Sequence, residues 1–145
     1  MLGCASNWMR CCVASSYVLA VHTLVGAGII HTRKAEEDDN RLSYLATKFL
    51  STGEGAYLNW LRLYDPDKAW DTPNFRRELD SCPNPLYYAS LGGIADTANR
   101  LVEEGTDVNA QGGYYGNALQ AASAEGHDRI VEVLLSKVAV QELGN

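Results

Sequence analysis

Hydrophobic residues fall at helical spacing in two short segments in the middle of the chain. In the first segment they occupy positions i, i+3, i+4, i+7 and i+8, at Leu42, Leu45, Ala46, Phe49 and Leu50. The second segment repeats this stripe at Tyr57, Trp60, Leu61 and Tyr64. Residues 51–55 are polar and glycine-rich, so they separate the two predicted helices. Asp65-Pro66 ends the second helix, because proline excludes the helical basin for the residue before it.

Residues 65–85 follow as a connector that holds all four prolines of the chain. Proline, aspartate and asparagine at this density predict an extended, turn-rich segment. We expect three of its apolar side chains to pack against the preceding helices: Trp70, Phe75 and Leu79.

The last sixty or so residues repeat themselves with a period of 33 positions. At this offset Asn84 meets Asn117, and further identities follow at Leu86/Leu119, Ala89/Ala122, Ser90/Ser123, Gly93/Gly126 and Leu101/Leu134. Each copy predicts two antiparallel helices, whose small residues allow close approach and whose glycine allows the turn between them. The second helices have apolar stripes at Leu101, Val102, Leu134 and Leu135, and Gly105 ends the first of these helices.

These residues resemble the ankyrin repeat. The family's Thr-Pro-Leu-His opening stands here as Asn84-Pro85-Leu86-Tyr87 and Asn117-Ala118-Leu119-Gln120. Gly126-His127 matches the family's Gly-His turn, Gly93-Ile94 departs from it, and residues 105–110 resemble the β-turn finger. The resemblance implies an all-α, ankyrin-type helix-turn-helix solenoid with two clear repeats and an N-terminal helical cap. Two repeats are fewer than the roughly three that usually bury a continuous core. We therefore expect a marginal fold, or association through the last helix near Val131, Val138 and Val140.

A narrower resemblance covers residues 57–66, 85–90 and 115–123. These segments resemble the start of the repeat array in large fungal NACHT/ankyrin proteins, many of which have a nucleotide-binding module before the repeats. No Gly-x-x-x-x-Gly-Lys-Ser/Thr loop occurs in this chain, so the resemblance implies an isolated or truncated repeat segment and not an NTPase. The expected organisation is an apolar segment at 1–32, a helical cap and connector at 33–83, repeats at 84–138 and a tail at 139–145.

The N-terminal segment leaves three interpretations open. No charged residue occurs from Cys11 to Thr32, so residues 11–30 could form a buried helix, a signal peptide or a membrane anchor. We favour a buried or poorly ordered helix, because Ser15, Ser16 and His22 dilute the apolar run. Three cysteines crowd the first twelve residues and Cys82 stands apart, which favours reduced thiols and a cytoplasmic or nuclear protein.

The sequence offers little for catalysis or metal binding. His22, His31 and His127 have no zinc-ligand spacing, and residues 112–116 are glycine-rich but lack the lysine of a phosphate-binding loop. We therefore expect no catalytic residue, cofactor or metal, and a protein that is not an enzyme. The formal net charge of −6 disfavours direct binding to nucleic acid.

Binding to another protein is the function that the resemblance implies. In ankyrin arrays the finger tips and the exposed sides of the first helices form a concave binding face. On that pattern the expected partner-binding residues are Tyr88, Leu91, Gln111, Tyr114, Tyr115, Ala121 and Glu125. We expect Tyr87 to fill space between the repeats. Residues 73–145 contain five bases and ten acids, a net charge of −5, which favours a partner with a basic or mixed surface.

Two functions follow from these expectations. The first is a protein–protein interaction module that acts as a regulatory adaptor or a transcriptional coregulator without catalytic activity. The alternative is a membrane-tethered or exported ankyrin protein anchored through residues 11–30.

Overall fold

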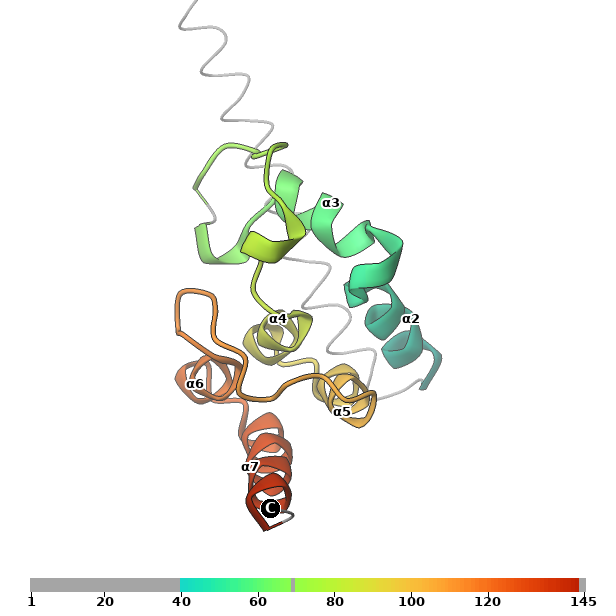
Figure 1. The fold of residues 1–145 in the computed structure, drawn as a ribbon, viewed down its shortest axis with the longest axis vertical. Helices are drawn as coiled ribbons and strands as arrows, with labels where there is room; N and C mark the ends of the chain where they lie inside the picture. The colour runs from blue at the N-terminus through green and yellow to red at the C-terminus, as the bar shows by residue number, and fades with distance from the viewer. Residues whose placement is uncertain (1–39, 69, 144–145) are drawn as a thin grey trace, which may run out of the picture.

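The computed structural model describes residues 40–68 and 70–143. Within these ranges the regular elements are α-helices and short 3₁₀-helices, so the protein is all-α, as the sequence predicts (Figure 1). The α-helices are α2 (Asn40–Leu50), α3 (Ala56–Leu63), α4 (Pro85–Gly92), α5 (Ala95–Glu103), α6 (Ala118–Ala124) and α7 (Asp128–Leu143). The 3₁₀-helices are η1 (Thr52–Glu54), η2 (Pro66–Lys68) and η3 (Leu79–Ser81).

Helix α2 forms where the sequence predicts it, but its buried face differs from the predicted one. Leu45 and Phe49 are 54% and 45% exposed, whereas Ser43 and Thr47 are buried beside α5. Hydrogen bonds make this burial possible. The Thr47 hydroxyl donates to the Ser43 carbonyl at 2.7 Å, and Arg100 Nε on α5 donates to Ser43 Oγ at 2.9 Å. The predicted apolar stripe is therefore only partly buried: Leu50 belongs to the core and Ala46 is half-buried, but Leu45 and Phe49 were predicted wrongly.

Helix α3 has the aromatic stripe in the predicted position. Tyr57, Trp60 and Leu61 are buried, and the Trp60 ring lies 5.4 Å from the ring of Tyr88 on α4 in an edge-to-face arrangement. The helix ends at Leu63, just before Asp65-Pro66. The break before it is also confirmed, since residues 51–55 contain η1.

Polar contacts, more than apolar packing, hold the connector between α3 and α4 in place. Leu79 packs against the core as expected, but Trp70 and Phe75 are 81% and 68% exposed, so their predicted packing was wrong. The segment is tied down by Arg77 instead. Its guanidinium pairs with Asp65 at 2.5 Å and donates to the Leu61 carbonyl at 3.2 Å. These bonds fix the path of the backbone without burying either aromatic ring.

The four remaining helices form two pairs, α4–α5 and α6–α7, at the predicted 33-residue offset. Asn84 and Asn117 cap α4 and α6 by accepting from backbone N–H groups at 2.9 and 2.8 Å. Gly93 and Gly126 have φ of 72° and 73°, so both turns use the left-handed region as expected. Gly105, with φ of 90°, likewise follows the end of α5.

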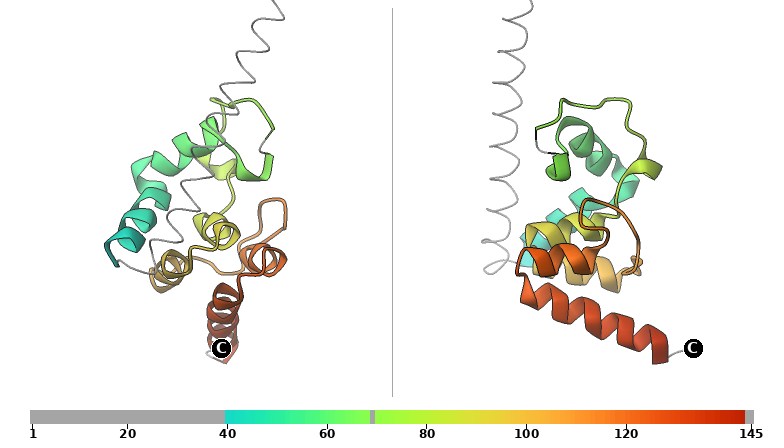
Figure 2. Two further views of the ribbon diagram at one scale, coloured as in Figure 1. Left: turned by 180° about the vertical axis from the view of Figure 1, so that it is seen from behind. Right: turned by 90° about the vertical axis from the view of Figure 1, so that its left-hand side faces the viewer.

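The two pairs lie side by side. Helix α4 contacts α6, and α5 contacts α7, so the pairs form two adjoining layers (Figure 1; Figure 2). Small residues occupy the contact region, including the fully buried Ala89, Ala98 and Ala122. On the opposite side, α2 and α3 cover the α4–α5 pair, in part through the contact of α2 with α5. The core is therefore continuous from α3 to α7.

The apolar stripe of α7 is buried only in part. Leu134 is 1% exposed, but Leu135 is 50% exposed, which corrects the prediction that both belong to the packed stripe. Val131 and Val138 are partly buried against the core, and the side chain of Val140 lies outside the described residues. Leu135 stays exposed because α7 is the outermost helix of the described fold (Figure 2).

Candidate protein-binding surface

The glycine-rich loop, residues 111–117, connects the two helix pairs and is a tight turn. Gln111 and Asn117 pair as an antiparallel bridge, and Gly112 N–H donates to the Gly116 carbonyl at 2.7 Å. Gly113 and Gly116 have φ of 78° and 92°, a region that residues with a Cβ rarely adopt. The glycines therefore serve the turn itself, which confirms the prediction of a turn.

Two side chains from distant parts of the sequence hold this loop in place. One is Asp67 of η2, whose Oδ2 accepts the Tyr114 N–H at 3.0 Å and whose Oδ1 accepts the Tyr87 hydroxyl at 2.7 Å. The other is Tyr87 of α4, whose Oη accepts the Tyr115 N–H at 3.2 Å. A Cβ at Gly113 would overlap the Tyr87 ring, so the loop lies directly on that ring.

Tyr87 is buried between these elements, as the sequence predicts. Burial raises the pKa of its phenol, and the hydrogen bond to Asp67 acts in the same direction. The phenol therefore stays neutral and serves both as a donor and as an acceptor. The glycine-rich loop is consequently attached to both η2 and α4.

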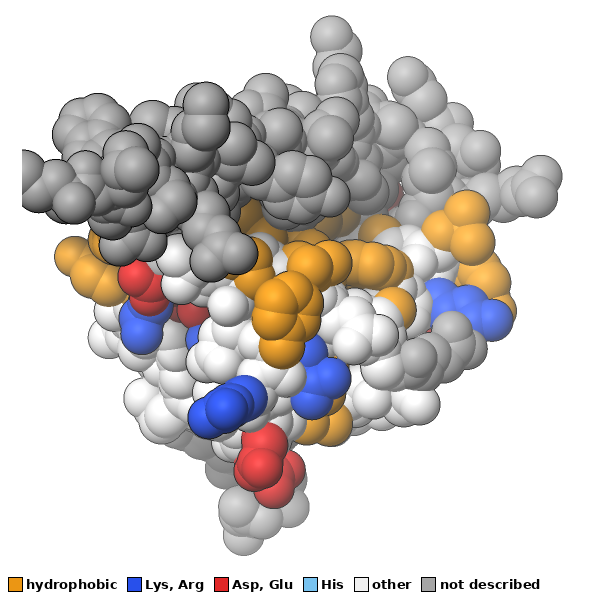
Figure 3. Space-filling model, turned by 90° about the horizontal axis from the view of Figure 1, so that it is seen from above, with side chains coloured by type: hydrophobic (Ala, Val, Ile, Leu, Met, Phe, Trp, Pro, Cys, Tyr) orange, Lys and Arg blue, Asp and Glu red, His pale blue; other side chains and the backbone are white. Residues whose placement is uncertain are grey.

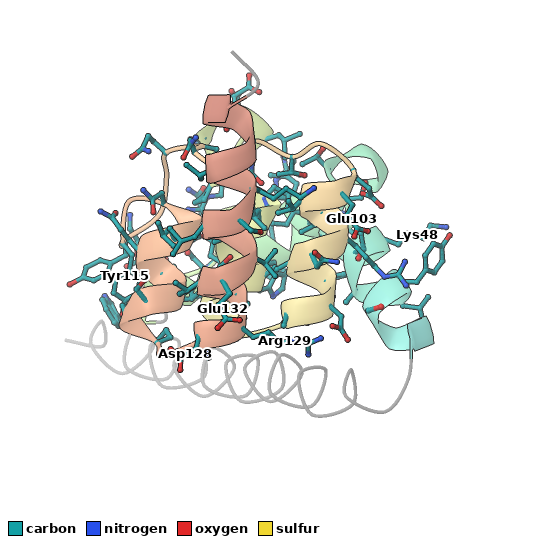
Figure 4. All side chains as sticks on the ribbon, turned by 90° about the horizontal axis from the view of Figure 1, so that it is seen from below. Lys48, Glu103, Tyr115, Asp128, Arg129 and Glu132 are labelled. Carbon is teal, nitrogen blue, oxygen red and sulfur yellow. The ribbon has the colours of Figure 1, made fainter. Side chains whose placement is uncertain are left out.

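The loop presents two aromatic rings at its tip. The side chain of Tyr114 is 78% exposed, and its ring lies 5.2 Å from that of Tyr115, nearly perpendicular to it. The Tyr115 hydroxyl donates to Glu125 Oε1 at 3.0 Å, and this hydrogen bond raises the pKa of the phenol. Figure 4 shows Tyr115 at the edge of the molecule, on the side of α6. Together these three residues form an exposed patch of aromatic and acidic groups.

The structure places the remaining predicted partner-binding residues less uniformly. Gln111 is exposed, and its Nε2 donates to the Asn109 carbonyl at 2.9 Å. Leu91 is half-buried, and its carbonyl lies 3.2 Å from His127 Nε2, which gives that histidine a structural contact. Gln111 lies on the glycine-rich loop with Tyr114 and Tyr115, and Leu91 lies on α4, which contacts α6. Both residues therefore remain candidates for partner binding.

Two predicted partner-binding residues are wrong because they are buried. Tyr88 is 2% exposed, and its ring packs against the rings of Trp60 and Tyr87. Ala121 is 0% exposed and belongs to the core on α6. A side chain inside the core cannot contact a partner, so both residues stabilise the fold. On α4 and α6, these two positions that the repeat pattern places on the binding face therefore point into the core instead.

A hydrogen-bonded cluster beneath the loop was not found from the sequence. Asp65 accepts from Arg77 at 2.5 Å and from the Tyr88 hydroxyl at 3.2 Å, and the Tyr57 hydroxyl donates to the Pro83 carbonyl at 2.5 Å. Burial raises the pKa of Tyr57 and of Tyr88 well above the usual value for tyrosine. For Arg77, burial lowers the pKa, but the hydrogen bond to Asp65 and the charge of that carboxylate, with smaller contributions from neighbouring groups, together outweigh burial, so the net pKa shift is upward.

The signal for this cluster was the Asp65-Pro66-Asp67 sequence. Two carboxylates directly after a buried aromatic helix can accept from tyrosines that pack on that helix. The sequence does not show which tyrosines those are, because Tyr87 and Tyr88 lie twenty or more positions away from the carboxylates they contact. The cluster joins the connector to α4 and so supports the position of the loop.

The connector also encloses a small polar pocket of about 70 Å³ beside Arg62, Lys68 and Asp71. Pockets that bind small molecules usually measure about 300–1,000 Å³, so this one is well below that size. The part of the chain that the structure describes contains no group of three or more His, Cys, Asp or Glu residues able to hold a metal. His22 and His31 lie outside the described residues.

None of the helices described between residues 40 and 143 has the length and apolar character needed to cross a membrane. The alternatives raised for residues 11–30 concern a segment outside the described residues.

The fold and the exposed patch define an all-α protein with a candidate protein-binding loop. The chain is 34% identical to the azaphilone pigments biosynthesis cluster protein L of Monascus ruber, over an alignment 119 residues long that covers 75% of this chain. The match covers 25% of that protein, so the chain spans about a quarter of the length of the curated relative. No family model matches the chain, and no solved structure matches it.

This similarity contradicts the expectation that the protein is not an enzyme. The relative is named as a protein of a biosynthesis cluster, which conflicts with an assignment that excludes catalysis. The expectation was based on missing local motifs in the sequence. Such motifs report only groups that are close along the chain, whereas folding also brings distant groups together, as it does for Asp67 and Tyr114.

Proposed function

We propose that this chain is a protein-binding module of ankyrin type that serves as an adaptor or regulator in pigment biosynthesis. The ankyrin assignment is supported by the agreement between the 33-residue sequence period and the two helix pairs. Equivalent backbone bonds occur in both turns. Ile94 N–H donates to the Ala89 carbonyl at 3.0 Å, and His127 N–H donates to the Ala122 carbonyl at 2.8 Å. These four residues are related in pairs by the same offset.

One observation carries the binding proposal. Tyr114 is 78% exposed, yet its backbone N–H is held by Asp67 at 3.0 Å. An aromatic side chain on a fixed backbone gives a partner a large contact area and loses little conformational entropy on binding. Tyr115 and Glu125 extend the same patch with a second ring and a carboxylate.

The role in pigment biosynthesis is supported by the name of the relative, over the quarter of that protein which the chain matches. An adaptor at the cluster would bind one of its enzymes or regulators, and a transcriptional coregulator would bind a transcription factor. In both cases the glycine-rich loop is the proposed contact surface.

Site-specific photocrosslinking tests the binding proposal. A photoreactive phenylalanine analogue is placed at Tyr114 or, as a control, at Tyr44, which is 56% exposed on α2, a helix on the opposite side of the fold from the loop (Figure 1). We expect the probe at position 114 to form a discrete adduct in cells that express the pathway. Equal adducts from both positions would contradict a specific surface at the loop.

A second measurement tests the pathway. The gene is deleted in the source organism and complemented with the wild type, with Tyr114→Ala or with Tyr44→Ala, and pigment yield is measured by liquid chromatography. The wild type and Tyr44→Ala should restore the yield, and Tyr114→Ala should not. Unchanged pigment after deletion would contradict the role in biosynthesis. An experimental structure tests the repeat assignment separately, because α4–α5 and α6–α7 should superpose after a 33-residue shift.

A further inference from the structure

The connector pocket is the polar cavity of about 70 Å³ that the connector forms with the end of α3. Its walls include three bases, Arg62, Lys68 and Arg77, and two acids, Asp65 and Asp71, so their net charge is +1. The whole chain has 12 bases and 18 acids, so the charge at this pocket has the opposite sign. Figure 3 views the molecule from the side on which the connector lies in Figure 1, and it shows Lys and Arg side chains exposed on that face. The connector pocket therefore attracts anions.

The three bases differ in how far the fold already uses them. The guanidinium of Arg77 pairs with Asp65 at 2.5 Å and donates to the Leu61 carbonyl at 3.2 Å. Arg62 uses only its Nε, which donates to the Arg77 carbonyl at 3.0 Å. Among the residues that the structure describes, the two terminal amino groups of Arg62 make no hydrogen bond, and Lys68 forms no ion pair. A ligand in the connector pocket therefore meets two cations with N–H groups to donate.

Hydrogen bonds fix the walls of the connector pocket before any ligand enters. The Asn74 N–H donates to the Arg62 carbonyl at 2.8 Å, so Arg62 is held both by its backbone and by its Nε. The Asp71 N–H donates to the Lys68 carbonyl at 2.8 Å and closes the turn that presents Lys68. Walls that are already ordered lose little conformational entropy on binding, which favours the capture of even a small ligand.

We propose that the connector pocket binds one carboxylate group, with Arg62 and Lys68 as its hydrogen-bond donors. This site lies outside the glycine-rich loop, so it adds a second binding site to the proposed protein-binding surface. The carboxylate is either the side chain of an acidic residue on a partner protein or a free small carboxylic acid, and the two sources share the same chemistry at the pocket.

Size and charge together select a carboxylate. One water molecule needs about 10–15 Å³ of cavity volume, so a pocket of about 70 Å³ holds about five non-hydrogen atoms. A carboxylate with its neighbouring methylene group is within this size. One carboxylate also neutralises the net charge of +1 on the walls, whereas a phosphate dianion would place excess negative charge beside Asp71. The planar guanidinium of Arg62 matches the two oxygens of a carboxylate.

NMR titration of the full chain tests the site with two probes, acetate and a Gly-Glu-Gly peptide with blocked termini. At constant ionic strength, the ¹H–¹⁵N signals of the Arg62 Nε–H and of the Asn74 amide should both shift and saturate, with millimolar dissociation constants for ligands of this size. Tighter binding of the peptide would support the pocket as a site for an acidic side chain. Tighter binding of acetate would support it as a site for a free carboxylic acid.

Four variants, read at the Asn74 amide, test the roles of the charges. Arg62→Gln should weaken acetate binding about tenfold, the effect of a lost hydrogen bond to a charged group. Lys68→Gln should weaken it about threefold, because this side chain is exposed to solvent, and Asp71→Asn should strengthen it about twofold by removing the opposing charge. Arg76→Gln is the matched control, since Arg76 is an exposed base of the connector outside the pocket walls, and no change is expected. Circular dichroism checks folding, and the exposed Lys68 keeps the test decisive if Arg62→Gln unfolds the chain.

Four results would overturn the inference. The first is the absence of a saturable shift with either probe. The second is wild-type affinity for acetate in both Arg62→Gln and Lys68→Gln. Equal weakening by Arg76→Gln would show that the anion is attracted to the surface in general. Inorganic phosphate that binds more tightly than acetate, with the same dependence on Arg62, would exclude selection of a monoanion. The crosslink from position 114 does not involve this pocket, so the proposed function is judged independently of all four results.

Discussion

Replacing Asp67 with asparagine tests whether the connector holds the glycine-rich loop in place. The two carboxylate oxygens have different donors, the Tyr87 hydroxyl at 2.7 Å and the Tyr114 N–H at 3.0 Å. Asparagine keeps the size of the side chain but removes its charge and leaves a single acceptor oxygen, so the Tyr87 hydroxyl and the Tyr114 N–H can no longer donate to separate oxygens of one carboxylate. A lost hydrogen bond to a charged group costs about 1.5–3 kcal/mol. We expect Asp67→Asn to lower the free energy of unfolding by this amount.

Urea unfolding followed by circular dichroism measures the change, and hydrogen exchange of the Tyr114 amide reports on the loop itself. Exchange at that amide should become faster in Asp67→Asn. The matched control is Asp80→Asn, an exposed carboxylate of the same connector, for which a change within about 0.5 kcal/mol is expected. Tyr87→Phe removes the hydroxyl that donates to Asp67. The losses of stability caused by Tyr87→Phe and Asp67→Asn should therefore not add up in the double variant. Equal stability of the two asparagine variants, with unchanged exchange at Tyr114, would refute the reasoning.

Three further predictions concern the core and the turn. Burial raises the pKa of Tyr88 above that of an unfolded tyrosine. Its contribution to stability is therefore complete below about pH 10 and is lost as the pH rises further. A free energy of unfolding in urea that does not change up to about pH 12 would contradict this. Gly113→Ala should cost about 1–3 kcal/mol in the same assay because of its positive φ and the ring beneath it, whereas Gly53→Ala, with no contact nearer than 3.8 Å, should cost less than about 1 kcal/mol. Leu134→Ala should lower the free energy of unfolding by about 2–5 kcal/mol, and Leu135→Ala should lower it by about 1 kcal/mol or less. Thermal unfolding compares the two variants, and equal shifts of the midpoint temperature would show that both leucines are equally packed.

The helices themselves could be predicted because local signals specify them. The ends of α3, α4 and α6 coincide with proline, asparagine caps and glycine turns, each of which acts within a few residues. The 33-residue period likewise indicates two equivalent helix pairs, because a repeated local pattern folds in the same local way.

The buried faces were predicted less well. On α2 the apolar spacing indicated Leu45 and Phe49, but Ser43 and Thr47 are buried; Arg100 of α5 donates to the Ser43 hydroxyl, and the Thr47 hydroxyl donates to the Ser43 carbonyl. Periodicity measures the hydrophobicity of a face and contains no information about the groups on the neighbouring helix. Tyr88 and Ala121 fail as partner-binding residues because both side chains lie in the core.

For the binding loop, the sequence alone determined the chemistry that is available: a glycine-rich turn, two adjacent tyrosines and an acidic surrounding. Only the tertiary structure decided how that chemistry is presented. Asp67, from a connector that contains no repeat signal, accepts the Tyr114 N–H and so fixes the loop backbone. Hydrogen bonds between residues 47 positions apart depend on the packing of the helices between them, and no local sequence pattern encodes that packing.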